Sequence, residues 1–162
     1  MSDVAGAPHP NPDELGAPDL KVAGLQLWVH GRQFPDSPDY YDGNWLRVTV
    51  HAGAAGASVW TSGAILMVPD LVRWADQCDV LSNGGSQDAE LAPMEPELRV
   101  RIRQLDRLGH LTMQVLITPD NLTQEHSFEF EIDQSHLPGI AAQCRSIADA
   151  YPVRGESTKD GA

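Results

Sequence analysis

The sequence predicts an α+β domain with a mainly antiparallel sheet of six or seven strands and two helices packed on one face. Apolar and polar residues alternate along most of the chain, which is typical of half-buried strands. This alternation changes to a helical period near Val68 and again near Ser135. Strands therefore occur in runs rather than singly between helices, which favours an antiparallel sheet in the order strands, helix, strands, helix. The 162 residues suffice for one domain with its own core.

The first half of the chain contains three strand-like segments. They are residues 25–34, 45–52 and 58–66. In the second segment Leu46, Val48 and Val50 fall on one face, because side chains alternate along a strand. Gly53 and Gly56 mark the turn to the third segment.

Two helices are expected, one after each run of strands. The first begins at Pro69, since proline suits the first helical turn, and ends at Leu81. The second covers residues 137–150, and Asp133 or Ser135 can cap it. Each helix carries its apolar residues at helical spacing, so each buries one face.

The second half of the chain contains three or four further strands. They are residues 89–91, 97–105, 110–117 and 125–133. Two of these strands carry charges at alternate positions that point away from the core. These charges are Arg99, Arg101 and Arg103 on one strand and Glu129, Glu131 and Asp133 on another. We interpret this face as an exposed sheet surface on which opposite charges pair across strands.

The two ends of the chain differ in composition from this domain, which we place at residues 22–154. Residues 1–21 are rich in Pro, Ala and Gly, and we expect an acidic disordered tail there. Residues 155–162 are expected to form a flexible polar tail. The first residues lack the basic start and apolar core of a signal peptide, so the expected location is the cytoplasm.

The charge of the chain limits its partners. It has 23 acidic and 11 basic residues, a net charge of -12, and residues 21–154 alone hold 17 acidic and 10 basic residues. Such a domain would repel nucleic-acid phosphates and anionic lipid, so we expect neither as a partner. Its apolar stretches are also too short to span a bilayer.

The sequence offers no catalytic, cofactor or metal motif. The glycine-rich residues 53–57 lack the lysine of a phosphate-binding loop, and the six histidines lack metal-ligand spacing. Cys78 and Cys144 fall among apolar residues of the two helices, where we expect buried, inert thiols. We therefore expect a protein that is not an enzyme and that uses no cofactor.

The most distinctive segment is residues 34–45, where carboxylates and aromatic rings crowd a connection between two strands. We expect Gly43, Asn44 and Trp45 to serve the fold. The remaining polar and aromatic residues suit recognition of a basic protein, and the spacing of the three aspartates does not fit a calcium loop. These candidate contact residues are Asp36, Asp39, Tyr40, Tyr41 and Asp42.

Three stretches resemble the WapI family of bacterial immunity proteins. Residues 41–46 have the sequence YDGNWL, similar to an early signature of that family. Residues 128–138, FEFEIDQSHLP, and residues 151–155, YPVRG, resemble later parts of the family in the same order and spacing. The resemblance covers roughly residues 25–155.

This resemblance implies a cytoplasmic antidote that binds and blocks the toxic C-terminal domain of a cell-wall-associated or secreted polymorphic toxin, of which many are nucleases. It implies no enzymatic residue. The acidic charge fits a basic toxin domain as the partner, because opposite charge speeds encounter, and we expect a monomer in the free state. The alternative is a small-ligand or regulatory binding domain without a toxin. An enzyme with an unrecognised site is a third reading.

Overall fold

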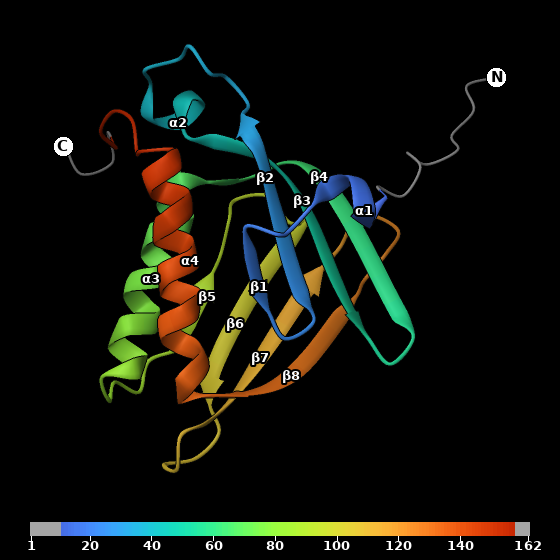
Figure 1. Ribbon diagram of the computed structural model, residues 1–162, viewed down its shortest axis with the longest axis vertical. Coiled ribbons are helices and arrows are strands. Elements are labelled where there is room, and N and C mark those ends of the chain that lie inside the picture. The colour runs from blue at the N-terminus through green and yellow to red at the C-terminus, as the bar shows by residue number, and fades with distance from the viewer. Residues whose placement is uncertain (1–10, 158–162) are drawn as a thin grey trace.

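The computed structural model describes residues 11–157, which form two four-stranded antiparallel sheets and two long helices (Figure 1). Sheet A has the order β1-β2-β3-β4 and sheet B the order β5-β6-β7-β8. The strands of sheet A are β1 (Leu20–Val22), β2 (Leu25–Arg32), β3 (Trp45–Ala54) and β4 (Ala57–Met67). Those of sheet B are β5 (Ala89–Leu91), β6 (Leu98–Gln104), β7 (His110–Ile117) and β8 (Ser127–Asp133).

The α+β class holds, but the expectation of one sheet of six or seven strands was wrong. Alternation tells which face of a strand is buried, whereas it does not tell which strands pair. Each strand pairs only with strands that are adjacent to it in the sequence. The helix between β4 and β5 separates the first four strands from the last four, and these form two sheets. The eighth strand, β1, was missed because it has only three residues and follows a proline-rich stretch.

The helices also differ from the two that were expected on one face of the sheet. The long ones, α3 (Val68–Ser82) and α4 (Leu137–Ala150), match the predicted positions. Two single-turn helices, α1 (Pro12–Leu15) and α2 (Tyr40–Gly43), and a 3₁₀ turn η1 (Gln134–His136) are additional. The Asp133 carboxylate accepts a hydrogen bond from the Ser135 N–H and caps the 3₁₀ turn. The helix α4 itself has His136 at its N-cap, without a side-chain cap bond, so the expected capping of this helix by Asp133 or Ser135 was wrong.

A single core lies between the two sheets and the helix pair. Figure 1 shows α3 and α4 side by side along one flank, where α3 contacts β5 of sheet B and α4 contacts β1 of sheet A. Leu46, Val48 and Val50 of sheet A are buried together with Val100 and Ile102 of sheet B. The helix pair therefore covers the junction of two sheets rather than one face of a single sheet.

The outer face of sheet A is partly covered by the segment before β1. The Trp28 Nε1–H donates to the Gly16 carbonyl over 3.0 Å, and the Val29 N–H donates to the Asp19 carboxylate over 2.7 Å. Trp28 also stacks on Trp60 at 5.7 Å between ring centroids. The tail expected at residues 1–21 thus includes ordered structure from residue 11 onward, and residues 1–10 and 158–162 lie outside the described part.

Candidate partner-binding site

The site is the connection from β2 to β3, residues 33–44, which projects beyond the end of sheet A (Figure 1). Asp39 shapes it, because its carboxylate accepts hydrogen bonds from the N–H groups of Tyr41 at 3.0 Å and Asp42 at 3.1 Å. This is the N-cap arrangement that starts α2. Asp39 is therefore a structural residue of the loop as well as one of its charges.

Gly43 and Asn44 fix the end of the loop. A Cβ on Gly43 would lie 2.5 Å from the Ser37 carbonyl oxygen, so only glycine allows the two sides of the loop to approach. Asn44 is fully buried, and its side-chain amide donates to the carbonyls of Tyr40 at 2.7 Å and Arg154 at 2.9 Å. The Arg154 N–H donates back to Asn44 Oδ1 at 2.9 Å. Asn44 thus ties the loop to the C-terminal segment.

Two arginines complete this junction from elsewhere in the chain. Arg154 Nη1 donates to the carbonyls of Pro35 at 2.6 Å and Ser37 at 3.0 Å. Arg32, at the end of β2, is 8% exposed and donates to the carbonyls of Gly43 and Pro152. Burial and the neighbouring positive charge of Arg154 lower the pKa of Arg32. Both guanidinium groups are therefore occupied by main-chain oxygens.

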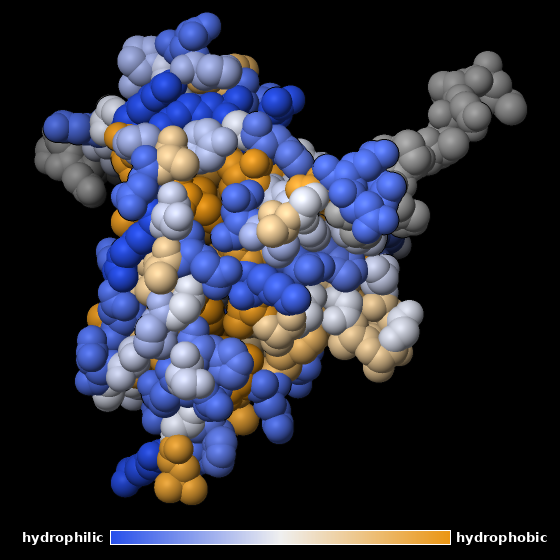
Figure 2. All heavy atoms as spheres, viewed as in Figure 1, coloured by the Kyte–Doolittle hydropathy of each residue, from blue (hydrophilic) through white to orange (hydrophobic). Residues whose placement is uncertain are grey.

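The carboxylates of Asp36 and Asp42 are left exposed by this arrangement. All ion pairs within residues 11–157 involve other acidic residues, so no residue of this part neutralises either aspartate. Asp36 lines a shallow hollow of about 340 Å³ together with Pro35, Ser37 and Arg154. Figure 2 shows hydrophilic residues over this end of the molecule.

The two tyrosines of the segment lie beside these charges. Tyr40 and Tyr41 are half-buried and meet edge to face, with ring centroids 5.2 Å apart. None of the five candidate contact residues is fully buried in the structure. Leu46 is buried as expected of a fold residue, whereas Trp45 is only half-buried.

The sequence reasoning missed Arg32 and Arg154 as residues that shape the site. Arg154 lies more than one hundred residues after the loop, and it was noted only as part of the closing YPVRG stretch. That stretch and YDGNWL are joined through Asn44 and Arg154. The sequence did contain a signal for Arg154, because it lies in a family motif that has no catalytic residue. Such a motif is expected to stabilise the fold, and here it does so by contacting the other motif.

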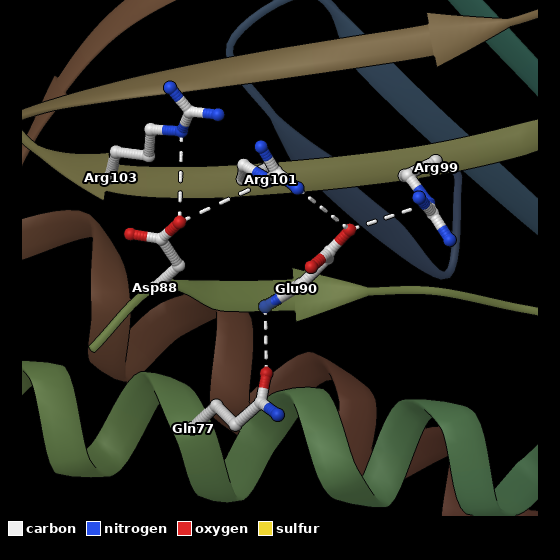
Figure 3. A network of polar contacts seen from close by, with 6 residues as sticks. All are labelled: Gln77, Asp88, Glu90, Arg99, Arg101 and Arg103. Atoms are coloured by element: carbon white, nitrogen blue, oxygen red, sulfur yellow. Dashed lines mark hydrogen bonds and ion pairs between the residues drawn. The ribbon is translucent and has the colours of Figure 1, made fainter.

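The second charged region is the outer face of sheet B, drawn in Figure 3. Glu90 of β5 lies 3.3 Å from Arg99 and 3.7 Å from Arg101 of β6. Asp88 pairs with Arg103 at 3.6 Å. The expected pairing of charges across strands is thus confirmed, but with β5 as the partner strand, since β7 separates β6 from the acidic residues of β8.

Other groups that could carry chemistry are buried or isolated. Burial and the charge of Asp79 raise the pKa of Cys78 to about 12, and burial likewise raises the pKa of Cys144. Both thiols are fully buried, as expected, and a protonated thiol is a poor nucleophile. Within residues 11–157 no three His, Cys, Asp or Glu side chains are arranged to hold a metal ion. No helix of this part has the length and apolar composition of a membrane span.

Residues 19–152 match the model of the immunity protein WapI-like family. The chain belongs to this family. The resemblance seen in its motifs is therefore confirmed, and the match includes β1, which the expected domain boundary at residue 22 cut through. Membership indicates an immunity protein, for which the partner is in general a toxin protein, and it favours a role other than catalysis.

No curated protein matches the sequence significantly. A solved structure, the crystal structure of WHY1 from Arabidopsis thaliana, has a TM-score of 0.42 and 10% sequence identity, over 80% of this chain and 78% of that chain. A likeness at this level carries no conclusion about binding or function.

Proposed function

We propose that this WapI-like protein binds the C-terminal domain of a cognate toxin as a monomer in the cytoplasm and neutralises it by occlusion. The observation that carries the proposal is the loop of residues 33–44. Its Asp36 and Asp42 carboxylates are exposed and form no ion pair with any described residue, and two aromatic rings lie beside them. A basic surface supplies the opposite charge that these groups lack, and charge complementarity speeds association and selects the partner.

The loop is also held in place before any partner arrives. Asn44, Arg154 and the Asp39 cap fix its main chain through five hydrogen bonds to or from loop groups, so little conformational entropy is lost on binding. A toxin that cleaves nucleic acid fits this arrangement, because the groove that receives phosphates is basic and can receive carboxylates instead.

The first experiment asks whether the protein is an antidote. The toxin C-terminal domain encoded beside this protein is expressed with and without it. We expect growth only with the protein present and a complex that can be purified. Cell death in both cases, with no complex formed, would contradict the proposal.

The second experiment asks whether the loop makes the contact. Replacing Asp36→Asn and Asp42→Asn should slow association by about tenfold at low salt, because long-range attraction is lost. Added salt should slow the wild type more than this double variant. The control is Glu14→Gln with Glu95→Gln, which removes the same charge from exposed positions outside the loop. Equal rates for the two double variants would show that net charge alone matters.

A further inference from the structure

The two sheets have four edge strands, and two of these edges are closed by glutamine side chains. The Lys21 N–H of β1 donates to Gln143 Oε1 at 2.7 Å, and Gln143 Nε2 donates to the Lys21 carbonyl at 3.2 Å. The Glu90 N–H of β5 donates to Gln77 Oε1 at 2.7 Å (Figure 3). Both edge strands have three residues. The helices α3 and α4 thus occupy the main-chain groups through which these edges could pair with another chain.

The other two edges, β4 and β8, are long, and they differ in regularity. The pairing of β4 shifts register between Leu46 and Arg47, and Gly63 has a φ of +150°. Such irregularities twist an edge away from further pairing. By contrast, β8 pairs with β7 without a register shift over its whole length. Residues 57–64 of β4 pair regularly, and the shift lies at the end of the strand beyond Ala64. Within residues 11–157, β8 is therefore the one long edge strand whose pairing has no register shift along its whole length.

At the acidic residues Glu129 and Glu131, the main-chain N–H and C=O groups of β8 face away from β7 and are open to solvent. The Ile117 N–H donates to the His126 carbonyl at one end, and the Gln134 N–H donates to the Gly109 carbonyl at the other. Because hydrogen-bonded pairs alternate along an antiparallel ladder, Phe128 and Phe130 bond to β7. The N–H and C=O groups of Ser127, Glu129 and Glu131 then face away from the sheet. All three of these residues are exposed, and no other described residue bonds their main-chain groups.

The side chains of this edge define the charge of what can pair with it. Glu129 and Glu131 lie on the outer face of sheet B, and they form no ion pair within the described residues. Phe128 and Phe130 pack against the core, so the strand cannot slip by one residue and exchange its faces. A second copy of this chain would place carboxylate opposite carboxylate, which is destabilising. A strand with basic side chains at alternate positions is complementary.

We propose that β8 receives an extended basic segment of the toxin domain, which adds a fifth strand to sheet B. This inference rests on the proposed function for its partner and names a contact separate from the loop. Residues of the added strand opposite Glu129 and Glu131 form main-chain hydrogen bonds and place their side chains on the same face as the two carboxylates. The main chain supplies affinity, and the alternate charges select the partner.

The edge is tested first with a probe peptide and the unmodified protein. The peptide has eight residues in which lysine and valine alternate, with both ends blocked. Amide resonances of the protein are followed during titration. We expect saturable binding, with the largest shifts at Ser127, Glu129 and Glu131. Shifts spread over the acidic surface, or centred elsewhere, would overturn the proposal.

Two control peptides separate strand addition from attraction by charge alone. In the first, glutamate replaces lysine, and we expect no binding. In the second, the main-chain nitrogens of the lysines are methylated, so the charge is kept while the hydrogen bonds to β8 are lost. We expect this peptide to bind about tenfold more weakly or less. Equal binding of the methylated and unmethylated peptides would overturn the proposal.

Two variants of Glu131 test whether main-chain hydrogen bonds of β8, rather than its charge alone, are needed for peptide binding. Glu131→Pro removes an outward N–H, a change that edge strands tolerate, whereas Glu131→Gln removes only the charge. We expect the proline variant to lose peptide binding and the glutamine variant to keep part of it. The unmodified protein and the methylated peptide decide the question if the proline variant does not fold.

The complex with the toxin domain distinguishes this inference from the proposed function. Hydrogen exchange at the Ser127, Glu129 and Glu131 amides should slow by about tenfold or more when the toxin domain binds. A complex that protects cells without slowing exchange there would overturn the contact at β8 and leave the antidote function standing. If no complex forms, the antidote function fails, while the peptide titration still decides whether the edge accepts a basic strand.

Discussion

The loop of residues 33–44 and the β5–β6 face of sheet B both concentrate charged residues, but they use them differently. On sheet B, Asp88 and Glu90 are neutralised by three arginines of the neighbouring strand. In the loop, the arginine that lies nearby, Arg154, donates to main-chain carbonyls instead of carboxylates. On sheet B, the pairs of arginine with carboxylate hold the edge strand β5 against β6. In the loop, the arginine binds main-chain oxygens, so the carboxylates remain available to a partner.

This difference distinguishes carboxylates that stabilise the fold from carboxylates that can bind a partner. A carboxylate that is already paired gains little from a partner, because its own ion pair must first be broken. An exposed carboxylate without a pair gains both attraction and hydrogen bonds. The paired region should therefore contribute to stability more than to binding, and the unpaired carboxylates of the loop should contribute to binding more than to stability.

The largest effect is expected at Asn44, which supports the loop. Asn44→Ala removes three hydrogen bonds, and the N–H and C=O groups of Arg154 lose the partners that the Asn44 side chain gives them. Because Asn44 is fully buried, we expect a loss of about 3 kcal/mol in the free energy of unfolding, measured in urea. Asp36→Asn is the control and should leave stability unchanged. A similar loss in both variants would remove the distinction between support and contact.

A smaller effect is expected at Arg154. Arg154→Ala removes the two hydrogen bonds to Pro35 and Ser37, and we expect a loss of about 1.5 kcal/mol and faster hydrogen exchange in residues 35–42. Arg154→Lys keeps the charge, but its shorter side chain and more strongly hydrated ammonium are less suited to reach both carbonyls, so it should restore less than half of the loss. Full restoration by lysine would show that charge, rather than geometry, holds the loop.

Breaking the paired region should have a modest effect on stability and a smaller effect on binding than the loop variants have. Glu90→Gln weakens the ion pairs with Arg99 and Arg101, which are partly exposed, so we expect a loss of about 0.5 kcal/mol. Toxin association should slow less than in the Asp36 and Asp42 double variant. A larger slowing in Glu90→Gln would place the contact on the face of sheet B.

The smallest effect concerns a paired carboxylate at the far end of sheet B. The Asp106 carboxylate lies 2.6 Å from His110 Nδ1, which raises the pKa of His110 and lowers that of Asp106. A raised histidine pKa stabilises the fold at pH values below about 6.5, and this contribution is lost as pH rises through the folded value. NMR titration should give a His110 pKa above about 6.5 that falls in Asp106→Asn. An unchanged pKa in that variant would show that the pair does not form.

The positions of most strands and of both long helices followed from the sequence. Periodicity is a local property, and the buried residues of β3, β6 and α3 lie where alternation or helical spacing placed them. The buried state of Cys78 and Cys144 also follows from local composition. The family could be identified because its motifs are contiguous stretches of this chain.

Only the tertiary structure decided how these elements combine. The division into two sheets, the closure of β1 and β5 by Gln143 and Gln77, and the open edge at β8 depend on contacts between distant segments. The same holds for the loop, whose shape depends on Arg154, a residue more than one hundred positions away. Local patterns determine which residues are buried, because burial repeats with the period of each element. Partners across the fold are set by packing and by the need to satisfy buried polar groups, and no local period records them.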